Sequence, residues 1–433
     1  MSVSEPTERD RLRELPDDLL HRILRFLDTR QVVTDLSSLS LRWRYLWATL
    51  PFITLRSGYN VSEKFGNLLL LLLDGTVPLR TFCLHSCYWK NIEYEHRWLR
   101  HALTRGLCVL ELNLSSGHRF QLPECVFSCT TLEEFNLFTT SMESIAPRSV
   151  CLPGLKKLLL HAVRFADPSV AEKISSGCPA LEDLSLSLCS LGSFKILSDT
   201  LKILSITNCH SEEIHVSAPN LCSLRLTVSG EVHLDGMPFL VSAQVHLCDG
   251  GVQYLAQSGY DLAAALCNAQ HLELFRFNLF LQDITGGSAL EGLSFCKLKN
   301  LYIGEWRVAD FYGPLAYFLW CAPNLVALTL DQWKLYQLHN GNANLEVLEK
   351  KSKVELKLVS SLTRDLETLL IRLSKGDDTG EFRKVRRLLK EKTKPKETDS
   401  VVLDPFFSSQ LLCSTIVLLF IDIKVCTWLL ALC

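Results

Sequence analysis

Residues 181–210 read LEDLSLSLCSLGSFKILSDTLKILSITNCH, and two copies of one pattern begin in this stretch, at Leu181 and at Leu201. Each copy fits L-x-x-L-x-L. In its terminal L-x-L, alternate side chains point to opposite faces of a strand, so the leucines face a core and the residue between them faces outward. One such strand cannot bury its apolar face alone. The pattern therefore predicts a stack of repeated units.

The pattern recurs along most of the chain. The other copies are LRTFCL (79), LCVLEL (107), LEEFNL (132), LKKLLL (155), LCSLRL (221), LVSAQV (240), LELFRF (272), LKNLYI (298) and LVALTL (325). Most successive copies start about 20 to 28 residues apart, which is the period of leucine-rich repeats. We therefore predict an α/β fold with a curved leucine-rich-repeat solenoid over residues 51–335, its strands on the concave side.

The longer repeats have room for a helix on the convex side. SVAEKISS (169–176) follows Asp-Pro and precedes a glycine, which are typical helix start and stop signals. EHRWLRHALTR (95–105), DLAAALCNA (261–269) and FYGPLAYFLW (311–320) occupy the same place in their repeats, and the run 68–73 is expected to be the buried helix of the first repeat. The copies at 181, 201 and 221 are too short for a full helix, so irregular or 3₁₀ connections are expected there.

The stretch LPDDLLHRILRFLDTRQVVTDLSSLSLRWRYLW (15–47) has helical periodicity instead. Its first apolar stripe, which begins just after a proline and two aspartates, is Leu19, Leu20, Ile23, Leu24 and Leu27. Thr29 is the expected N-cap of a second short helix. Trp43, Leu46 and Trp47 form another stripe. Three helices of this size make a marginal core, so their stripes are expected to face the rest of the chain or another protein.

These two parts together resemble the plant F-box proteins with leucine-rich repeats. The resemblance rests on LPDDLLHRILRFL (15–27), on LSLRWRYLW (39–47), and on the repeats with their preceding CPALEDL, APNLCSL and CAPNLVAL. It implies a small N-terminal helical F-box, at residues 10–50, ahead of the solenoid. In that family the F-box binds a Skp1-like adaptor and through it a cullin, and the repeats hold a target protein for an SCF-type ubiquitin ligase.

Carried over to this chain, the resemblance predicts which residues bind the adaptor. They are Leu15, Pro16, Leu19, Ile23, Leu24, Leu39, Trp43, Leu46 and Trp47. The chain departs from the family pattern at Ser38, where an apolar residue is frequent, and at Leu41, where a basic one is frequent. Both departures could weaken adaptor binding. The alternative is that these helices only cap the repeat array, which would make the chain a non-ligase interaction scaffold.

The outward residues of the predicted strands form a candidate target-binding face. The central positions are Glu111, Asn136, Leu159, Ser185, Ser205, Arg225, Gln244, Arg276, Tyr302 and Thr329, and flanking ones include Glu134, Lys157, His161, Asp183, His246, Asn300 and Asp331. Both charge signs mix with small polar residues, so a protein target fits this face better than nucleic acid or an inositol phosphate. Aromatic and arginine side chains dominate binding at interfaces. The favoured residues are Arg225, Arg276, Tyr302, Trp306 and Trp333. The sequence does not decide whether a small ligand also fills part of this face.

The composition and the motifs limit which other functions the chain can have. The 433 residues carry a formal net charge of −2, so no overall field attracts nucleic acid or a membrane. The polar N-terminus has no signal-peptide pattern, and the 17 cysteines then indicate free thiols in the cytoplasm and/or the nucleus. Cys83/Cys87 and Cys125/Cys129 have no second pair at ligand spacing, so no metal or other cofactor is predicted. The familiar nucleotide-binding and hydrolase motifs are missing, which predicts a non-catalytic protein.

The repeat pattern fades after residue 335. Residues 336–410 form a charged segment with KVRRLLKEKTKPK (384–396), which is either a solvated helix end and linker or a nuclear-localisation or lipid-binding patch. The last stretch, residues 411–433, is apolar and long enough to span a bilayer, but Asp422 and Lys424 lie near its middle. Each charge at a helix centre costs about 2.5–3.5 kcal/mol on insertion. An atypical tail is therefore favoured over a membrane anchor.

Overall fold

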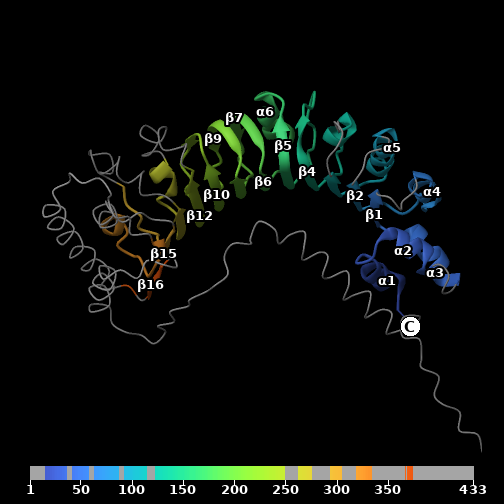
Figure 1. The fold of residues 1–433 in the computed structure, drawn as a ribbon, viewed down its shortest axis with the longest axis horizontal. Helices are drawn as coiled ribbons and strands as arrows, with labels where there is room; N and C mark the ends of the chain where they lie inside the picture. The colour runs from blue at the N-terminus through green and yellow to red at the C-terminus, as the bar shows by residue number, and fades with distance from the viewer. Residues whose placement is uncertain are drawn as a thin grey trace, which may run out of the picture. The chain divides into compact units, whose positions relative to one another are not determined.

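The computed structural model of the chain describes residues 15–36, 41–57, 63–86, 92–114, 122–248, 262–275, 293–304, 318–333, 366 and 368–373. These residues divide into two compact units, and the boundary between the units falls between Ser141 and Met142. The boundary lies inside the region that the sequence predicts as repeats. Figure 1 shows the elements of each unit in chain order.

The first unit begins with a helical cluster, drawn in blue in Figure 1. The cluster comprises α1 (Asp17–Leu24), α2 (Thr29–Thr34), α3 (Leu41–Leu46) and the 3₁₀ turn η2 (Trp47–Thr49). Its buried core is Leu20, Leu24, Val32, Leu46, Leu50 and Phe52, and Leu15, Leu27, Leu36, Trp43 and Trp47 pack against this core while partly buried. The predicted helices are therefore present, and they fill a core of their own.

The start of α2 lies one residue from its predicted position. Asp28, not Thr29, is the N-cap, and its Oδ1 accepts a hydrogen bond from the Arg30 N–H at 2.8 Å. The hydroxyl of the fully buried Thr29 instead accepts from the backbone N–H of Thr54 at 2.8 Å. This bond joins the helical cluster to the first strand of the repeats.

The strands of the first unit are parallel and lie side by side in chain order. They are β1 (Phe52–Ser57), β2 (Thr81–Ser86), β3 (Val109–Leu114) and the first part of β4 (Glu134–Ile145), which continues past the boundary at Ser141. Between them lie α4 (Glu63–Leu72), α5 (Ile92–Leu103) and the 3₁₀ turn η3 (Glu124–Ser128). Figure 1 shows α4 and α5 on the same side of β1 and β2. Alternate residues of β2 and β3 are buried, as the repeat pattern predicts.

Helix α4 is apolar on both its buried and its exposed face. Leu69, Leu70 and Leu73 are buried. Leu68, Leu71 and Leu72 are exposed, so the prediction of a buried helix over 68–73 holds for one face only. The buried side packs on α5, where the Trp98 indole N–H donates to Asn67 Oδ1 at 2.8 Å.

The second unit contains one long parallel ladder of strands, here called the main ladder. In spatial order it comprises β5 (Lys157–Phe165), β6 (Asp183–Ser187), β8 (Ile203–Thr207), β10 (Ser223–Val228), β12 (Ser242–Leu247), β13 (His271–Phe275), β14 (Asn300–Gly304), β15 (Ala327–Trp333) and β16 (Thr368–Leu373). Leu184, Leu204 and Leu224 are in register on neighbouring strands and all are buried. The predicted inward leucines therefore form one continuous core.

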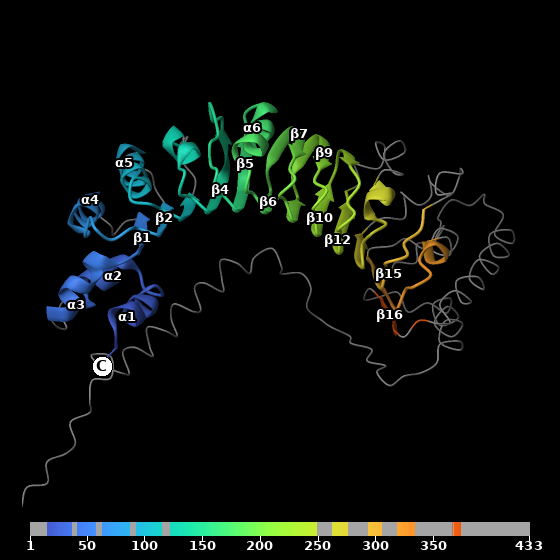
Figure 2. The same ribbon diagram turned by 180° about the vertical axis from the view of Figure 1, so that it is seen from behind.

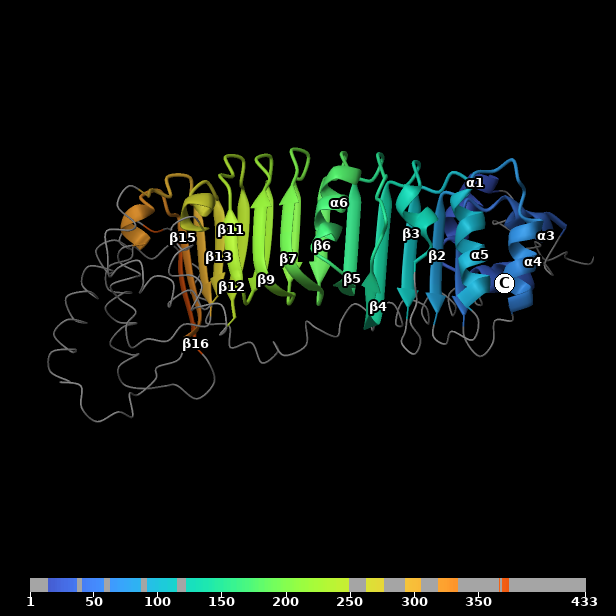
Figure 3. The same ribbon diagram turned by 90° about the horizontal axis from the view of Figure 1, so that it is seen from above.

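A second parallel ladder replaces the irregular connections that we expected after residues 181, 201 and 221. It consists of β7 (Ser190–Leu197), β9 (His210–Ser217) and β11 (Glu231–Leu234), which pair in that order. Figure 2 shows β7 and β9 on the opposite side of the second unit from β10 and β12, and Figure 3 shows β7, β9 and β11 side by side. The expectation was wrong because SFKI (193–196), EIHV (213–216) and EVHL (231–234), which align in this ladder, all alternate in hydrophobicity with period two, which favours a strand.

The repeats extend past their predicted end at residue 335. Strand β16 pairs with β15 and aligns Leu369 with Leu328 and Ile371 with Leu330. LETLLI (366–371) fits the same L-x-x-L-x-L pattern, and Leu366 is buried as Leu325 is at the corresponding position. The charged residues that surround this copy concealed it in the sequence.

The predicted repeat helices are found wherever the structure describes them. Helix α6 (Ser169–Gly177) follows β5, and shorter helical segments cover 262–266 and 318–321. No helix in the described ranges is both long and apolar enough to cross a membrane. Residues 411–433 lie outside those ranges.

Candidate functional site

The helical cluster of the first unit carries the predicted adaptor-binding residues, and they separate by burial. Leu24 and Leu46 are core residues, exposed by 1% and 4%. As packed here, they have no surface to offer a partner, so their assignment to the adaptor-facing set is corrected to a role in holding the cluster together. Each such leucine contributes on the order of 1.5–3 kcal/mol to folding by its burial.

The other predicted residues are nearer the surface. Pro16 and Leu19 are exposed and Ile23 is half-buried. Leu15, Trp43 and Trp47 pack against the core while partly buried, and Leu39 lies outside the described residues. The predicted residues whose apolar side chains remain accessible to a partner are therefore chiefly those of α1, Leu19 and Ile23.

Two large exposed aromatic side chains of the same cluster escaped the predictions from sequence. Phe26 and Tyr45 are each 68% exposed. Leu19 belongs to the same exposed set, at 42%. Leu19 and Phe26 are seven residues apart, with the half-buried Ile23 between them at a helical spacing, whereas Tyr45 belongs to α3. The signal was present in LRFL and RYLW, but periodicity alone could not show which residues point outward.

A polar clamp fixes the start of α1 against α3. The Arg42 guanidinium donates to the Leu15 carbonyl oxygen and to Asp17 Oδ1, both at 2.5 Å. The carboxylate of Asp17 lies in the first turn of α1, where it also suits the positive end of the helix. The clamp therefore orients the exposed part of α1.

Of the predicted target-binding residues, Arg225 and Tyr302 lie on the outward side of the main ladder of the second unit, here called the main-ladder face. Backbone pairing puts Ser205, Arg225 and Gln244 at one level on β8, β10 and β12, as predicted. Arg225 is exposed. Tyr302 is half-buried and lies at the same level as Thr329. Trp333 is the last residue of β15, and Trp306 and Arg276 lie outside the described residues.

One predicted central position is wrong by three residues. Gln244 pairs in register with Glu273, and Glu273 pairs with Tyr302, so Glu273 and not Arg276 is central on β13. The segment LELFRF has apolar residues at 272, 274, 275 and 277, and two alignments fit the pattern equally well. The correction replaces an expected positive charge by a negative one.

Three rings meet on the main-ladder face, on β12, β13 and β14, in a group here called the ring cluster. The ring centroids of His246 and Phe275 are 5.6 Å apart, and those of Phe275 and Tyr302 are 5.3 Å apart. Both pairs are tilted, and all three side chains are half-buried. Of the three, the sequence pattern favoured Tyr302 and marked His246 as a flanking residue.

Comparisons with known proteins identify both parts of the chain. Residues 12–55 match the F-box domain model, and residues 96–242 match the model described as FBD-associated F-box protein At5g56370, LRR repeats. The F-box/LRR-repeat protein At4g14103 of Arabidopsis thaliana is 32% identical over 259 residues, which cover 55% of this chain and 68% of that protein. The chain belongs to the F-box/LRR-repeat family.

Other relatives agree with this family assignment. The FBD-associated F-box protein At5g56370 of Arabidopsis thaliana is 28% identical over 382 residues, 85% of each chain. The F-box/FBD/LRR-repeat protein At5g56420 from the same plant is 30% identical over 255 residues, 55% of this chain and 60% of that protein. A solved structure, the Leptospira interrogans LRR protein LIC12759, aligns with 86% of this chain and 94% of its own at 14% identity, but its TM-score of 0.38 is too low to support an argument.

The resemblance and the fold class inferred from the sequence are thus confirmed. The chain is an α/β protein with an N-terminal F-box followed by leucine-rich repeats. F-box/LRR-repeat proteins are generally non-catalytic adaptors of the ubiquitin pathway, and an F-box in general implies a Skp1-type partner.

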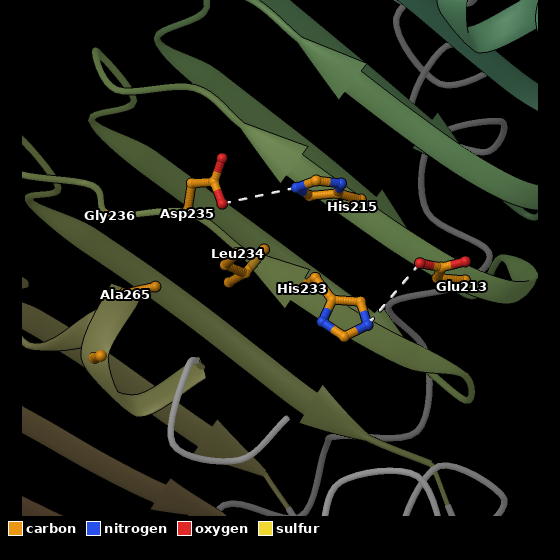
Figure 4. A pocket seen from close by; sticks show the side chains of 8 residues that line it. Glu213, His215, His233, Leu234, Asp235, Gly236 and Ala265 are labelled. Carbon is orange, nitrogen blue, oxygen red and sulfur yellow. Dashed lines mark ion pairs between the residues drawn. The ribbon is translucent and has the colours of Figure 1, made fainter. Parts of the chain in front are cut away.

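The F-box/LRR-repeat protein also has a hollow of about 630 Å³ beside its second ladder. Figure 4 shows His215 directed at Asp235 and His233 directed at Glu213, with Leu234 and Ala265 nearby. The His215 Nε2–Asp235 Oδ1 distance is 3.7 Å, and His233 Nε2 lies 3.9 Å from Glu213 Oε1 and 3.2 Å from Glu231 Oε1. The two imidazoles thus point to different carboxylates and do not converge on one point.

Metal-binding side chains do not gather in the described parts of the F-box/LRR-repeat protein. Within the ranges given above, no group of three or more His, Cys, Asp or Glu residues could hold a metal ion. Of the cysteines weighed as ligands, Cys87 lies outside these ranges. Burial raises the pKa of the Cys83 thiol to about 12, which disfavours the thiolate that a metal requires.

Proposed function

We propose that this F-box/LRR-repeat protein is the substrate-receptor subunit of an SCF-type ubiquitin ligase. Its F-box binds a Skp1-like adaptor and thereby a cullin, and its main-ladder face holds a target protein whose identity the chain does not reveal. The protein is itself non-catalytic. It contributes proximity and orientation of the target's lysines to chemistry carried out by other subunits.

The exposed apolar side chains of the F-box carry this proposal. Leu19, Phe26 and Tyr45 are exposed although the cluster has a complete core of its own. Burying them in an interface gains about 25 cal/mol for each Å² of apolar surface. Together with the half-buried Ile23 and the start of α1 that Arg42 holds, these exposed side chains are the ones that we propose an adaptor covers.

The balance of charge on the main-ladder face supports a protein target over nucleic acid. The central row across β8–β15 contains one cation, Arg225, and one anion, Glu273, with neutral residues between and beyond them. A surface that binds nucleic acid gathers Lys and Arg on one face. We assign the protein to the cytoplasm and/or the nucleus, where an SCF-type ligase operates, and expect no membrane attachment.

Co-purification with a Skp1-like adaptor tests the proposal. The full chain is expected to form a stoichiometric complex, and a Leu19→Asp/Ile23→Asp double variant is expected to lose it while retaining the circular-dichroism spectrum of the folded chain. Leu72→Asp is a matched control, because Leu72 is another exposed leucine of the first unit and lies outside the F-box. If the folded wild-type chain binds no adaptor, the ligase function is wrong. The chain is then an interaction scaffold with a helical cap.

A further inference from the structure

We infer that the ring cluster and Glu273 form a recognition site for a cationic side chain, arginine or lysine, of the target protein. The inference deepens the proposed function, because it rests on the main-ladder face being the surface that holds the target. It is carried by the rings, by the charges around them and by the groups that fix the rings in place.

The rings offer a continuous aromatic platform. His246, Phe275 and Tyr302 lie on three neighbouring strands, and the centroid distances of 5.6 Å and 5.3 Å leave no wide gap between one ring and the next. A cation over the face of Phe or Tyr is attracted when it lies within about 6 Å of the ring centroid. All three rings are half-buried and stand at outward positions of their strands, so a partner group on the main-ladder face can reach them.

The platform is held in one arrangement by its neighbours. The Tyr302 hydroxyl donates to Asp331 Oδ2 at 2.5 Å, which fixes the phenol ring across β14 and β15. Gly304 makes room for Phe275, since a Cβ at residue 304 would lie 2.6 Å from Phe275 Cδ1. A preformed arrangement of this kind lowers the entropy cost of binding.

The charges at this end of the main-ladder face favour a positively charged ligand. The outward positions of β12–β15, all within the described residues, carry two carboxylates, Glu273 and Asp331, and no Lys or Arg. Glu273 is exposed and lies at the level of Tyr302 on the adjacent strand. A cation seated on the rings can therefore also contact a carboxylate. An anionic group would meet repulsion there, and a purely aliphatic one would leave the carboxylate unused.

Arginine fits the site better than lysine. Its planar guanidinium can stack on a ring while its N–H groups bond a carboxylate side-on, whereas the lysine ammonium is a compact, strongly hydrated charge. Arg225 lies two strands from Glu273, on β10, and adds a positive flank that disfavours a second cation beyond the platform. The preferred target segment thus presents one arginine or lysine at its centre and no other cation toward β10.

Selection from a phage-displayed library of random dodecapeptides on the purified full chain, without adaptor, tests the inference. Arginine and lysine are expected to be enriched in the selected peptides. Glu273→Lys is expected to weaken the best of these peptides at least tenfold and to shift a fresh selection toward aspartate and glutamate. Tyr302→Leu should weaken the same peptides without reversing the preference. Glu212→Lys is the matched control, because Glu212 is an exposed carboxylate on the second ladder.

Three results would overturn the inference. These are selected peptides that are acidic or uncharged, selected peptides that bind Glu273→Lys as well as they bind the wild type, and no enrichment at all. Uncharged peptides that are lost with Tyr302→Leu would contradict only the cation preference and leave the face as a target site. Because the selection needs no adaptor, loss of adaptor binding in the earlier experiment bears on the ligase function alone.

Discussion

At the scale of single residues, Gly177 is fixed by the backbone that passes beside it. It is the last residue of α6, and its carbonyl accepts a hydrogen bond from the Leu152 N–H at 2.8 Å. A Cβ here would lie 2.6 Å from the carbonyl carbon of Val150. That atom is backbone and cannot move aside as a side chain would.

We therefore expect Gly177→Ala to lower the free energy of unfolding by about 1–3 kcal/mol, the usual cost of forced overpacking. Gly75→Ala is the control, since nothing lies within 4 Å of a Cβ at Gly75. Urea denaturation of the three proteins measures the difference. Equal midpoints for Gly177→Ala and the wild type would show that the backbone at Val150 yields freely.

The cysteines differ in reactivity because they differ in burial. Burial raises the pKa of Cys83 and of Cys178 to about 12, from an ordinary value of 9.0. Near pH 8, such a thiol carries roughly a thousandfold less thiolate, which is the reactive form. Cys151, Cys222 and Cys296 are exposed.

Mass-spectrometric mapping after brief iodoacetamide treatment should therefore find Cys151, Cys222 and Cys296 modified, with Cys83 and Cys178 protected. In denaturant all five should react alike, which is the control for accessibility. Rapid labelling of Cys178 in the folded chain would contradict its place in the core.

Two histidines link stability to pH. Burial lowers the pKa of His85, with the nearby Arg56 guanidinium adding to the effect, and burial lowers the pKa of His161. A histidine with a lowered folded pKa contributes stability that is present above its ordinary value of 6.5 and lost as the pH falls through the folded pKa.

The temperature of the thermal unfolding midpoint should consequently decrease as the pH is lowered from about 7.5 to about 5. It should decrease less in a His85→Asn/His161→Asn variant. Circular dichroism at each pH gives the midpoints. An identical fall in both proteins would assign the acid sensitivity to other groups.

At the scale of elements, a left-handed residue recurs in several repeats, within β4 and β5 and in the connections from β6 to β7 and from β8 to β9. Met142, Ala162, Leu188 and Asn208 have φ between 53° and 55°. Only asparagine among these visits this region readily, and other L-residues pay about 1–2 kcal/mol for it. The shared turn sends the chain from the main ladder toward the second ladder, at Leu188 before β7 and at Asn208 before β9.

Leu188→Asn should thus stabilise the protein by up to about 1 kcal/mol, because asparagine tolerates the left-handed region and Leu188 is already 37% exposed. Leu197→Asn is the matched control, since Leu197 is an exposed leucine of β7 outside the left-handed region. Chemical denaturation compares the two. A loss of stability in Leu188→Asn would mean that the packing of the leucine outweighs its backbone strain.

Hydrophobic period predicted most of these elements and missed others for identifiable reasons. Most main-ladder strands were predicted because their leucines alternate with an unmixed period of two, whereas α5 and α6 were predicted from their place in the repeats and α6 also from its start and stop signals. The strands of the second ladder were missed because repeat length, rather than their own alternation, was used to judge them. Whether the leucines of α4 are buried could not be read from LLLLLL, since a continuous apolar run marks no face.

At the scale of the whole molecule, the apolar C-terminal stretch 411–433 allows a direct test of membrane attachment. The two charges near its middle oppose insertion by about 2.5–3.5 kcal/mol each. In detergent-free flotation with liposomes, the full chain and a chain ending at Gln410 are expected to behave alike. If the full chain floats with the liposomes and the chain ending at Gln410 does not, residues 411–433 are a membrane anchor.

By itself, the sequence determined that an F-box precedes leucine-rich repeats, which family the chain belongs to, and which face of nearly every main-ladder strand points inward. Period-two leucines leave one way to bury a strand, so the leucine pattern alone places Arg225, Gln244 and Tyr302 at their correct levels. Only the tertiary structure decided the alignment of β13, where mixed apolar spacing fits two registers and Glu273 replaces Arg276. It alone brought together His246, Phe275 and Tyr302, because these residues are far apart in the sequence and only pairing between strands makes them neighbours.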